Sequence, residues 1–186
     1  MSLLEQQNFL AKLYTDEKLR RDFLSEPSKI GQENYLNEIE IAEITEILPE
    51  EISFFAESLF WKRLREVEKI LPLTLKISDD VFQKLFRAFS QNYNPQTIKK
   101  HLEDANQFCL FLQQNDSVSE ITKNAAKYEQ AKLKFHNFGR NFVICRLNYD
   151  VRESSQIVKD ANYNLKKKTQ IAIWIRAGKT VRHFFI

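Results

Sequence analysis

The hydrophobic positions of this chain recur with helical spacing from the N-terminus to about residue 138. In the first such stretch, Ser2 and Glu5 form an S-x-x-E pattern that is typical of a helix start. Gly31 and the polar residues after it predict a loop. We expect six or seven helices, at about residues 2–14, 16–26, 38–48, 49–71, 78–90, 94–114 and 119–136.

Proline and apolar spacing define the longest predicted helix. Pro49 suits its first position, which needs no backbone N–H bond, and Pro72 ends it. Its predicted apolar face comprises Ile52, Phe55, Leu59, Val67 and Leu71. Its other face carries Trp61, Lys62, Arg63, Arg65 and Lys69. That face is interpreted either as a solvated, ion-paired surface or as a surface that binds nucleic acid.

Capping residues, proline and apolar spacing also define the next two predicted helices, at about 78–90 and 94–114. Asn94 is expected to cap one of them and Pro95 to be its first residue. The residues predicted to face the core here are Ile98, Leu102, Ala105, Phe108, Cys109 and Leu112. In the preceding helix they are Val81, Phe82, Leu85, Phe86 and Phe89.

The pattern changes to alternation after Gly139. The segment "NFVICRLNYDV" predicts a strand, with Val143, Cys145 and Leu147 on one face. The closing "TQIAIWIRAGKTVRHFFI" predicts a hairpin that places Ile171, Ile173 and Ile175 together and Ala172, Trp174 and Arg176 on the opposite face. We therefore expect a mainly α, α+β fold: a helical body followed by a small antiparallel C-terminal sheet. The predicted regions are 1–72, 73–138 and 139–186.

Composition agrees with a helical body, and charge divides the chain. Only 3 Gly and 4 Pro leave little room for the many tight turns of an all-β fold. Residues 1–131 hold 16 Lys and Arg against 22 Asp and Glu, a net charge of −6. Residues 132–186 hold 12 against 3, a net charge of +9. An anionic or acidic partner is therefore expected at the C-terminal end, unless this is a solvated basic face without a partner.

Patterns that would indicate catalysis are missing. His101, His136 and His183 lie on different predicted elements without a second ligand at metal-site spacing. The three glycines, at 31, 139 and 178, are too far apart for a nucleotide-binding loop or a G-x-S-x-G nucleophile turn. We expect no cofactor, no metal and a binding protein rather than an enzyme.

The cysteines and the N-terminus bear on location. Cys109 and Cys145 lie in apolar stretches and are expected to be buried free thiols in a reducing compartment. The N-terminal segment does not resemble a signal peptide, and no stretch approaches the roughly 18 apolar residues of a membrane span. The sequence therefore predicts a cytoplasmic protein that is not inserted in a membrane.

Several segments together resemble a known family. They are "FLAKLYTDEKLRRDFLSEP", "FFAESLFWKRLREVEKILPLT", "VFQKLFRAFSQNYNP", "HLEDANQFCLFLQQN", "AAKYEQAKLKF" and "IWIRAGKTVRHFFI". They are similar to helical partner proteins of multinuclear non-haem iron oxidative enzymes, of the HvfC, BufC and more distantly MbnC types, some described as DNA-binding domains. The resemblance implies an accessory protein of ribosomal peptide (RiPP) biosynthesis. It would recruit the leader segment of a precursor peptide to the modifying enzyme. The acidic "NEIEIAEITEILPEE" departs from better-known members.

The terminal hairpin supplies a physical route to peptide binding. An edge strand can pair with an extended peptide, and nearby cations attract acidic residues. The predicted binding residues are Trp174, Arg176, Lys179, Arg182, Phe184, Ile186, Lys167 and Lys168. Three alternatives stay open. Trp174, Phe184 and Ile186 can pack on the helical body while the protein covers its own edge. The chain can be a nucleic-acid-binding regulator that uses the basic helix 60–70 and its basic C-terminus, or a homodimer joined at the terminal edges.

Overall fold

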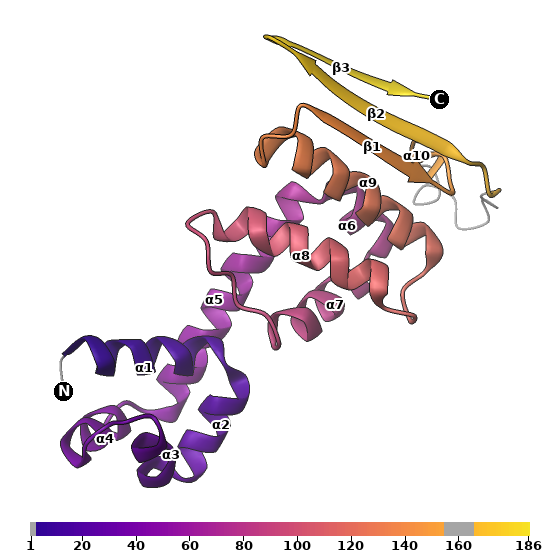
Figure 1. The fold of residues 1–186 in the computed structure, drawn as a ribbon. Coiled ribbons are helices and arrows are strands. Elements are labelled where there is room, and N and C mark those ends of the chain that lie inside the picture. Colours follow the sequence, from indigo (N-terminus) through magenta and orange to yellow (C-terminus); the bar gives the residue numbers. More distant parts are fainter. Residues whose placement is uncertain (1–2, 155–165) are drawn as a thin grey trace. The chain divides into compact units, whose positions relative to one another are not determined.

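The computed structural model describes residues 3–154 and 166–186, so Ser2 of the predicted helix start lies outside the described residues. Its described elements form a helical body followed by a three-stranded antiparallel sheet, which confirms the predicted fold class (Figure 1). The elements are α1 (Leu3–Thr15), α2 (Glu17–Ser25), α3 (Pro27–Glu33), α4 (Glu38–Thr45), α5 (Pro49–Ile70), α6 (Pro72–Ser78), α7 (Val81–Ser90), α8 (Lys100–Gln114), α9 (Glu120–Asn137), β1 (Phe142–Leu147), α10 (Val151–Ser154), β2 (Gln170–Ala177) and β3 (Thr180–Phe185).

Side-chain caps explain where several helices begin. Asp16 accepts a bond from the Leu19 N–H at the start of α2. Asn37 and Glu40 cap each other's backbone N–H groups at the start of α4. Ser119 caps α9 in the same way as Asp16 caps α2. Each cap satisfies a donor that has no partner within its helix, which stabilises the helix by about 1 kcal/mol.

The segment predicted as a loop around Gly31 is helical. Pro27 is the first residue of α3, and Gly31 lies buried within this helix. A Cβ atom added at Gly31 would stand 2.5 Å from Cγ1 of Ile41. The glycine is therefore needed for the close approach of α3 and α4, and not for a turn. Pro72 likewise begins α6, a helix that the sequence pattern did not predict.

Pro95, in contrast, does not begin a helix. The carboxylate of Glu103 accepts bonds from the N–H groups of Gln96 and Thr97, and these hold residues 95–99 outside the helix until α8 begins at Lys100. Ile98, predicted to face the core, is consequently 101% exposed. Val81, another predicted core residue, is also exposed, at the first position of α7.

The chain forms two compact units whose boundary lies within α5, between Arg63 and Leu64. The first unit runs to Arg63 and also contains Ser90–Asn94. Its core consists of Phe9, Leu13, Phe23, Leu36, Ile41, Ile44 and Ile52. The predicted apolar face of α5 is only partly right, because Phe55 is half exposed and rests against the Tyr14 ring, 4.4 Å between centroids. The buried α5 positions are Ile52, Ala56, Phe60, Leu64 and Val67.

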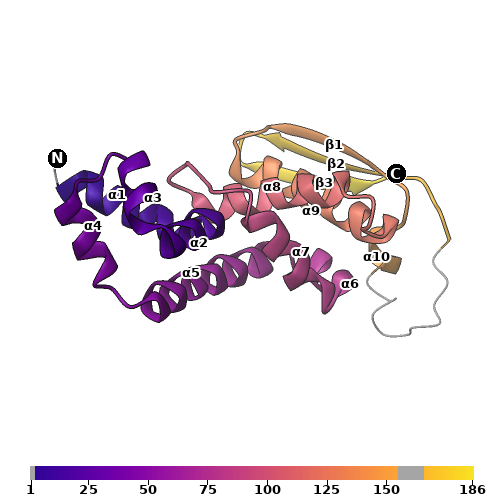
Figure 2. The ribbon, with the colours of Figure 1, turned by 90° about the horizontal axis from the view of Figure 1, so that it is seen from below.

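The second unit comprises Leu64–Phe89 and Pro95–Ile186. Its helices α7 and α8 meet through an aromatic cluster of Phe82, Phe86, Phe89, Phe108 and Phe111. In this unit α9 lies between α8 and the sheet (Figures 1 and 2). The three predicted regions of the sequence, 1–72, 73–138 and 139–186, stay a prediction.

A buried carboxylate joins α9 to α6. Glu129 accepts bonds from the N–H groups of Leu73 and Thr74 and from the Thr74 hydroxyl, at 2.8, 2.9 and 2.7 Å. It therefore caps the first turn of α6 from another helix. Burial raises the pKa of Glu129, and these hydrogen bonds partly oppose that rise.

The sheet has the order β1-β2-β3, with both pairs antiparallel. The predicted alternation of β1 and β2 is confirmed. Cys145 and Leu147 are buried on the same face as Ala172 and Trp174, and this face packs on Ala131 and Phe135 of α9. Phe142, Ile144 and the three isoleucines of β2 point to the opposite face.

Candidate functional site

The predicted binding residues belong to the hairpin of β2 and β3 and to the segment that precedes it. Ala177 pairs with Thr180, which leaves a two-residue turn of Gly178 and Lys179. Gly178 takes a φ of +59°, as the first central position of a tight hairpin turn requires. This turn fixes the register of β3, and with it the direction in which each backbone group of the strand points.

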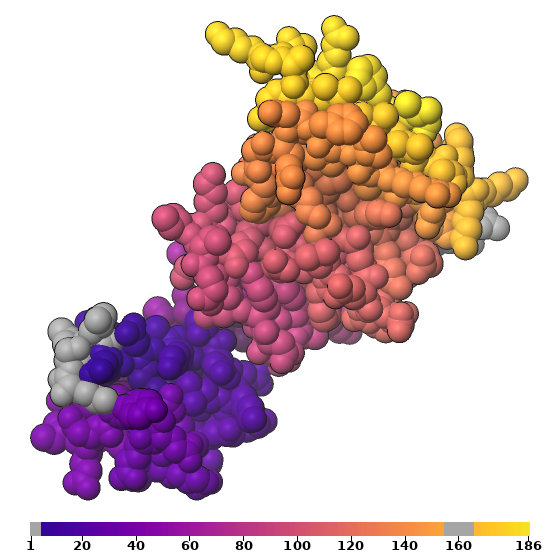
Figure 3. Space-filling model, viewed as in Figure 1, coloured from indigo at the N-terminus to yellow at the C-terminus, as the bar shows by residue number. Residues whose placement is uncertain are grey.

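One edge of the sheet is formed by β3. Ile171 and Ile186 exchange both backbone hydrogen bonds, at 2.8 and 2.9 Å. Since antiparallel pairs alternate between bonded and non-bonded, the N–H and C=O groups of Val181, His183 and Phe185 point away from β2. Within residues 3–154 and 166–186, none of these groups has a hydrogen-bond partner. The space-filling view places the C-terminal strands at the outer margin of the second unit (Figure 3). Within the described part of the chain, these groups therefore form an unpaired strand edge of the kind to which another extended chain can add.

Trp174 does not lie on an accessible surface. It is 2% exposed and belongs to the core between the sheet and α9. His183 of β3 stacks on it, with ring centroids 4.6 Å apart and ring planes 7° apart. Tyr128 of α9 contacts both rings. For Trp174 the structure therefore fits the interpretation that it packs on the helical body.

The other aromatic and aliphatic candidates are exposed. Phe184 and Ile186 are 44% and 77% exposed, on the sheet face opposite α9. Phe184 and Arg182 line a shallow hollow together with Ile175, Ala177 and Thr180. Phe184 and Arg182 therefore lie side by side, next to the β3 edge.

The five candidate cations lie at three places in the sheet region. Arg182 and Lys179 lie at the turn end of the hairpin and are exposed. Arg176 points to the α9 side, where its guanidinium stands 5.0 Å from the centroid of the Phe135 ring. Lys167 and Lys168 precede β2 and lie near the opposite end, because Ile171 pairs with Ile186. The eight candidates therefore do not form one cluster.

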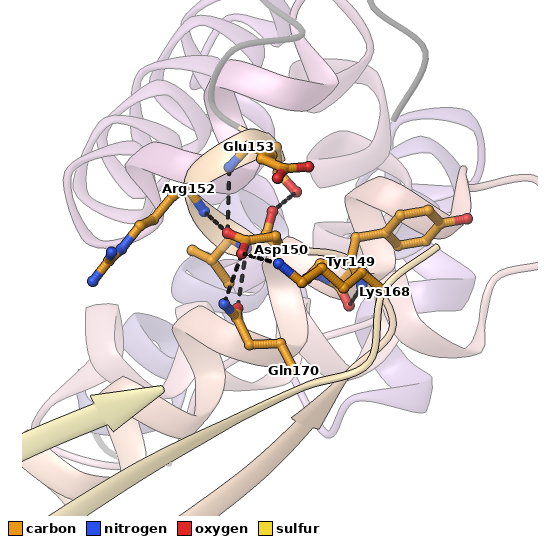
Figure 4. Close-up of polar contacts among 9 residues, drawn as sticks. Tyr149, Asp150, Arg152, Glu153, Lys168 and Gln170 are labelled. Carbon is orange, nitrogen blue, oxygen red and sulfur yellow. Dashed lines mark hydrogen bonds and ion pairs between the residues drawn. The ribbon is translucent and has the colours of Figure 1, made fainter. Parts of the chain in front are cut away.

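Lys168 takes part in a polar network that joins the end of β1 to the start of β2 (Figure 4). Its N–H donates to the Asn148 carbonyl, and its ammonium lies 3.8 Å from Asp150 Oδ2. Asp150 Oδ2 also accepts from Gln170 Nε2, at 3.0 Å, while Asp150 Oδ1 accepts from the Arg152 N–H. This geometry gives Lys168 a structural role, whereas the Lys167 side chain is exposed.

Charges around β3 act on His183. Partial burial lowers its pKa from the ordinary 6.5, and the nearby Lys132, Arg152 and His136 lower it further. The β1, β2 and β3 strands contain Arg146, Arg176 and Arg182 and no Asp or Glu. The region of the free edge is therefore basic, as the charge division of the sequence predicted for the C-terminal end.

The basic stretch of α5, the alternative nucleic-acid surface, is partly engaged in the protein's own contacts. Arg63 donates to the Tyr93 carbonyl at 2.9 Å, and Lys69 pairs with Glu66 at 2.7 Å. Lys62 and Arg65 are exposed. The cations of this helix are thus divided between internal contacts and solvent.

The thiols and acidic groups show no arrangement for chemistry in the described part of the chain. Cys109 and Cys145 are buried and free, as predicted, and burial raises the pKa of both thiols. No group of three or more His, Cys, Asp or Glu residues among the described positions is placed to hold a metal ion. Over the same positions, none of the helices combines the length and apolar character that a membrane crossing requires.

No family model matches the chain. No curated protein matches it either.

Sequence reasoning predicted a terminal edge strand and named its side chains, but it did not assign the outward backbone groups to particular residues. The signal was present, since the two-residue turn at Gly178 sets the register and the alternation then assigns Val181, His183 and Phe185 to the edge. The exposure of Ile144 and Phe142 was not predicted. A strand with apolar residues on both faces is equally typical of a strand buried on both sides.

Proposed function

We propose that this chain is a non-catalytic partner protein that binds the leader segment of a precursor peptide along β3 and recruits it to a modifying iron enzyme. The observation that carries the proposal is the free edge, where the backbone groups of Val181, His183 and Phe185 have no described partner. An extended peptide that adds to this edge gains main-chain hydrogen bonds that do not depend on its sequence. The link to an iron enzyme rests on the sequence resemblance.

Side chains beside the edge provide selectivity. Arg182 and Phe184 border the same hollow on the outer side of the hairpin, so an added strand meets one cation and one aromatic ring there. Lys179 extends the basic region at the turn. Such charges raise the rate of encounter with an acidic peptide and fix its register more than they add affinity.

The proposal expects a gene for an iron enzyme and one for a short precursor peptide beside the gene of this chain, and the test mixes those two products with the full chain. The expected result is co-elution of the three on size exclusion. In NMR spectra with the leader segment alone, the largest shifts are expected at the amides of Val181, His183 and Phe185. A scrambled leader of the same composition is the control.

Two results would contradict the proposal. One is no association with the leader at low salt. The other is association whose amide shifts fall on the helices and leave β3 unchanged. Binding to DNA or RNA that weakens steeply with salt, in place of peptide binding, would favour the regulator instead. A concentration-dependent dimer that blocks the leader would assign the edge to self-pairing.

A further inference from the structure

The sheet face opposite α9 carries an apolar patch. Its members lie in rows across the three strands, because Phe142 pairs with Ile175 and Ile175 with Arg182, while Ile144 pairs with Ile173 and Ile173 with Phe184. A third row joins Arg146, Ile171 and Ile186. We call this the outer-face patch; it consists of Phe142, Ile144, Ile171, Ile173, Ile175, Phe184 and Ile186, with Arg146 and Arg182 at opposite corners.

Among the described residues of the second unit, no helix covers this patch. Phe142 and Ile144 are each 56% exposed, although both are large and apolar. The helices described in this unit lie on the other face of the sheet (Figures 1 and 2). A monomer rarely leaves so many neighbouring apolar side chains in water unless they meet a partner.

The dimensions of the patch fit one helix. Three strands span about 10 Å between the outer strand axes, and the rows from Ile171 to Ile175 cover about 14 Å along them. A helix is about 10–12 Å wide and covers 14 Å in about nine residues. On the inner face of the same sheet, α9 already packs in this way.

The charges around the outer-face patch indicate which kind of partner helix would bind it. The three strands contain only cations among their charged residues, with Arg182 beside Phe184 at one corner and Arg146 at the other. Arg146 also borders a hollow next to β1 with Lys127 and with Lys123, which pairs there with Glu120. Two copies of this face would place like charges against each other, whereas an acidic partner would be attracted.

We propose that the outer-face patch is a docking site for an amphipathic helix of a partner protein, one with an apolar stripe flanked by acidic residues. The site shares Arg182 and Phe184 with the side chains proposed to select the edge-bound peptide, but it does not use the outward backbone groups of Val181, His183 and Phe185. It therefore does not depend on the proposed function.

The test uses the full chain and a fluorescein-labelled 18-residue helical peptide, with leucines at positions i, i+3, i+4 and i+7 and glutamates elsewhere. A matched peptide has lysines in place of the glutamates. Anisotropy at low salt is expected to show at least tenfold tighter binding of the glutamate peptide. Ile173→Thr, which keeps a β-branched residue at the centre of the patch, is expected to weaken binding at least tenfold. Ile98→Thr removes an exposed isoleucine elsewhere and is expected to change binding less than twofold.

A second variant within the patch and a variant at the β3 edge show whether the helical peptide lies on the outer face. Ile144→Thr is expected to act like Ile173→Thr, with circular dichroism melting curves that show both variants folded. Val181→Pro is expected to leave helical-peptide binding unchanged, whatever it does to a leader peptide. Equal binding of the two peptides, or equal loss in Ile98→Thr, would overturn the proposal. The proposal would also be overturned if the glutamate peptide does not bind and Ile173→Thr instead abolishes another association. Such an association could be a dimer, binding to phosphatidylglycerol vesicles or binding to oligouridine.

Discussion

His183 lies on Trp174 with the two rings nearly parallel, 4.6 Å between centroids, and so connects the free edge strand to the buried core. Phe185 holds the other side of His183, in an edge-on contact of 4.6 Å between centroids. The inward-facing side chains of β3 therefore anchor the strand, while its backbone groups at the same positions point outward. These contacts therefore hold the strand in place against the core.

Replacing His183 with Phe is expected to reduce the loss of stability in mild acid. The pKa of His183 is lowered in the folded state, so the folded protein binds fewer protons than the unfolded chain as the pH falls. The contribution of neutral His183 to the free energy of unfolding is therefore fully present above about pH 6.5. It is lost as the pH falls through the lowered pKa of His183 in the folded state. Melting temperatures at pH 7.5, 6.5, 5.5 and 5.0 should fall less steeply in His183→Phe than in the parent. Because the pKa of His136 is lowered as well, some dependence remains.

The control for that measurement is His101→Gln, on the exposed side of α8. Its melting temperatures should follow the parent at every pH. An unchanged slope in His183→Phe would show that His183 does not carry this dependence.

Val181→Pro tests the edge itself. The Val181 N–H points away from β2, so its loss removes no bond within the sheet, and edge strands tolerate proline at such positions. We expect at least a tenfold weaker affinity for the leader peptide, by calorimetry, with a melting temperature close to the parent. Ile173→Pro is the control with the opposite expectation. The Ile173 N–H donates a hydrogen bond to β3, so its loss should unfold the hairpin. Full leader affinity in a folded Val181→Pro protein would place the peptide elsewhere.

Lys179→Glu addresses the role of charge. Lys179 lies exposed in the hairpin turn, so its reversal leaves the strands intact. The association rate with an acidic leader peptide is expected to fall severalfold at low salt, with little change in the dissociation rate. The difference should disappear near 0.5 M salt, because screening shortens the reach of the field. Lys84→Glu, on the exposed side of α7, should leave both rates unchanged.

Glu129→Ala is expected to lower the free energy of unfolding of the second unit by about 2–4 kcal/mol, because it leaves two N–H groups and a hydroxyl at the start of α6 without their acceptor. Urea denaturation measures this loss. Glu120→Ala, which removes an ion pair between the exposed Glu120 and the partly buried Lys123, should cost less than about 1 kcal/mol. Equal effects of the two variants would contradict the capping role of Glu129.

Alternation made the sheet predictable, because a period of two assigns each side chain to a face regardless of tertiary context. Ala172 and Trp174 are therefore on the predicted face, and so are Ile171 and Ile173. The sequence did not indicate which face α9 would cover. Trp174 was accordingly named as a candidate for peptide contact but is buried.

Prolines were harder to interpret. Pro27, Pro49 and Pro72 each begin a helix, while four non-helical residues separate Pro95 from the start of α8. The difference comes from Glu103, whose carboxylate bonds the backbone of Gln96 and Thr97. A proline pattern alone does not reveal a side chain seven residues away that competes for those N–H groups.

Neighbouring residues of α9 bind structures on two sides of that helix. Tyr128 packs on Trp174 of the sheet, and Glu129 holds the first turn of α6. Loosening α9 would therefore release the sheet and α6 in the same event, so these parts should open together as one cooperative unit. Amide hydrogens in the middle of α9 should accordingly be among the slowest in the second unit to exchange with solvent. The β3 edge and the outer-face patch would then both rest on the slowest-exchanging helix of the second unit.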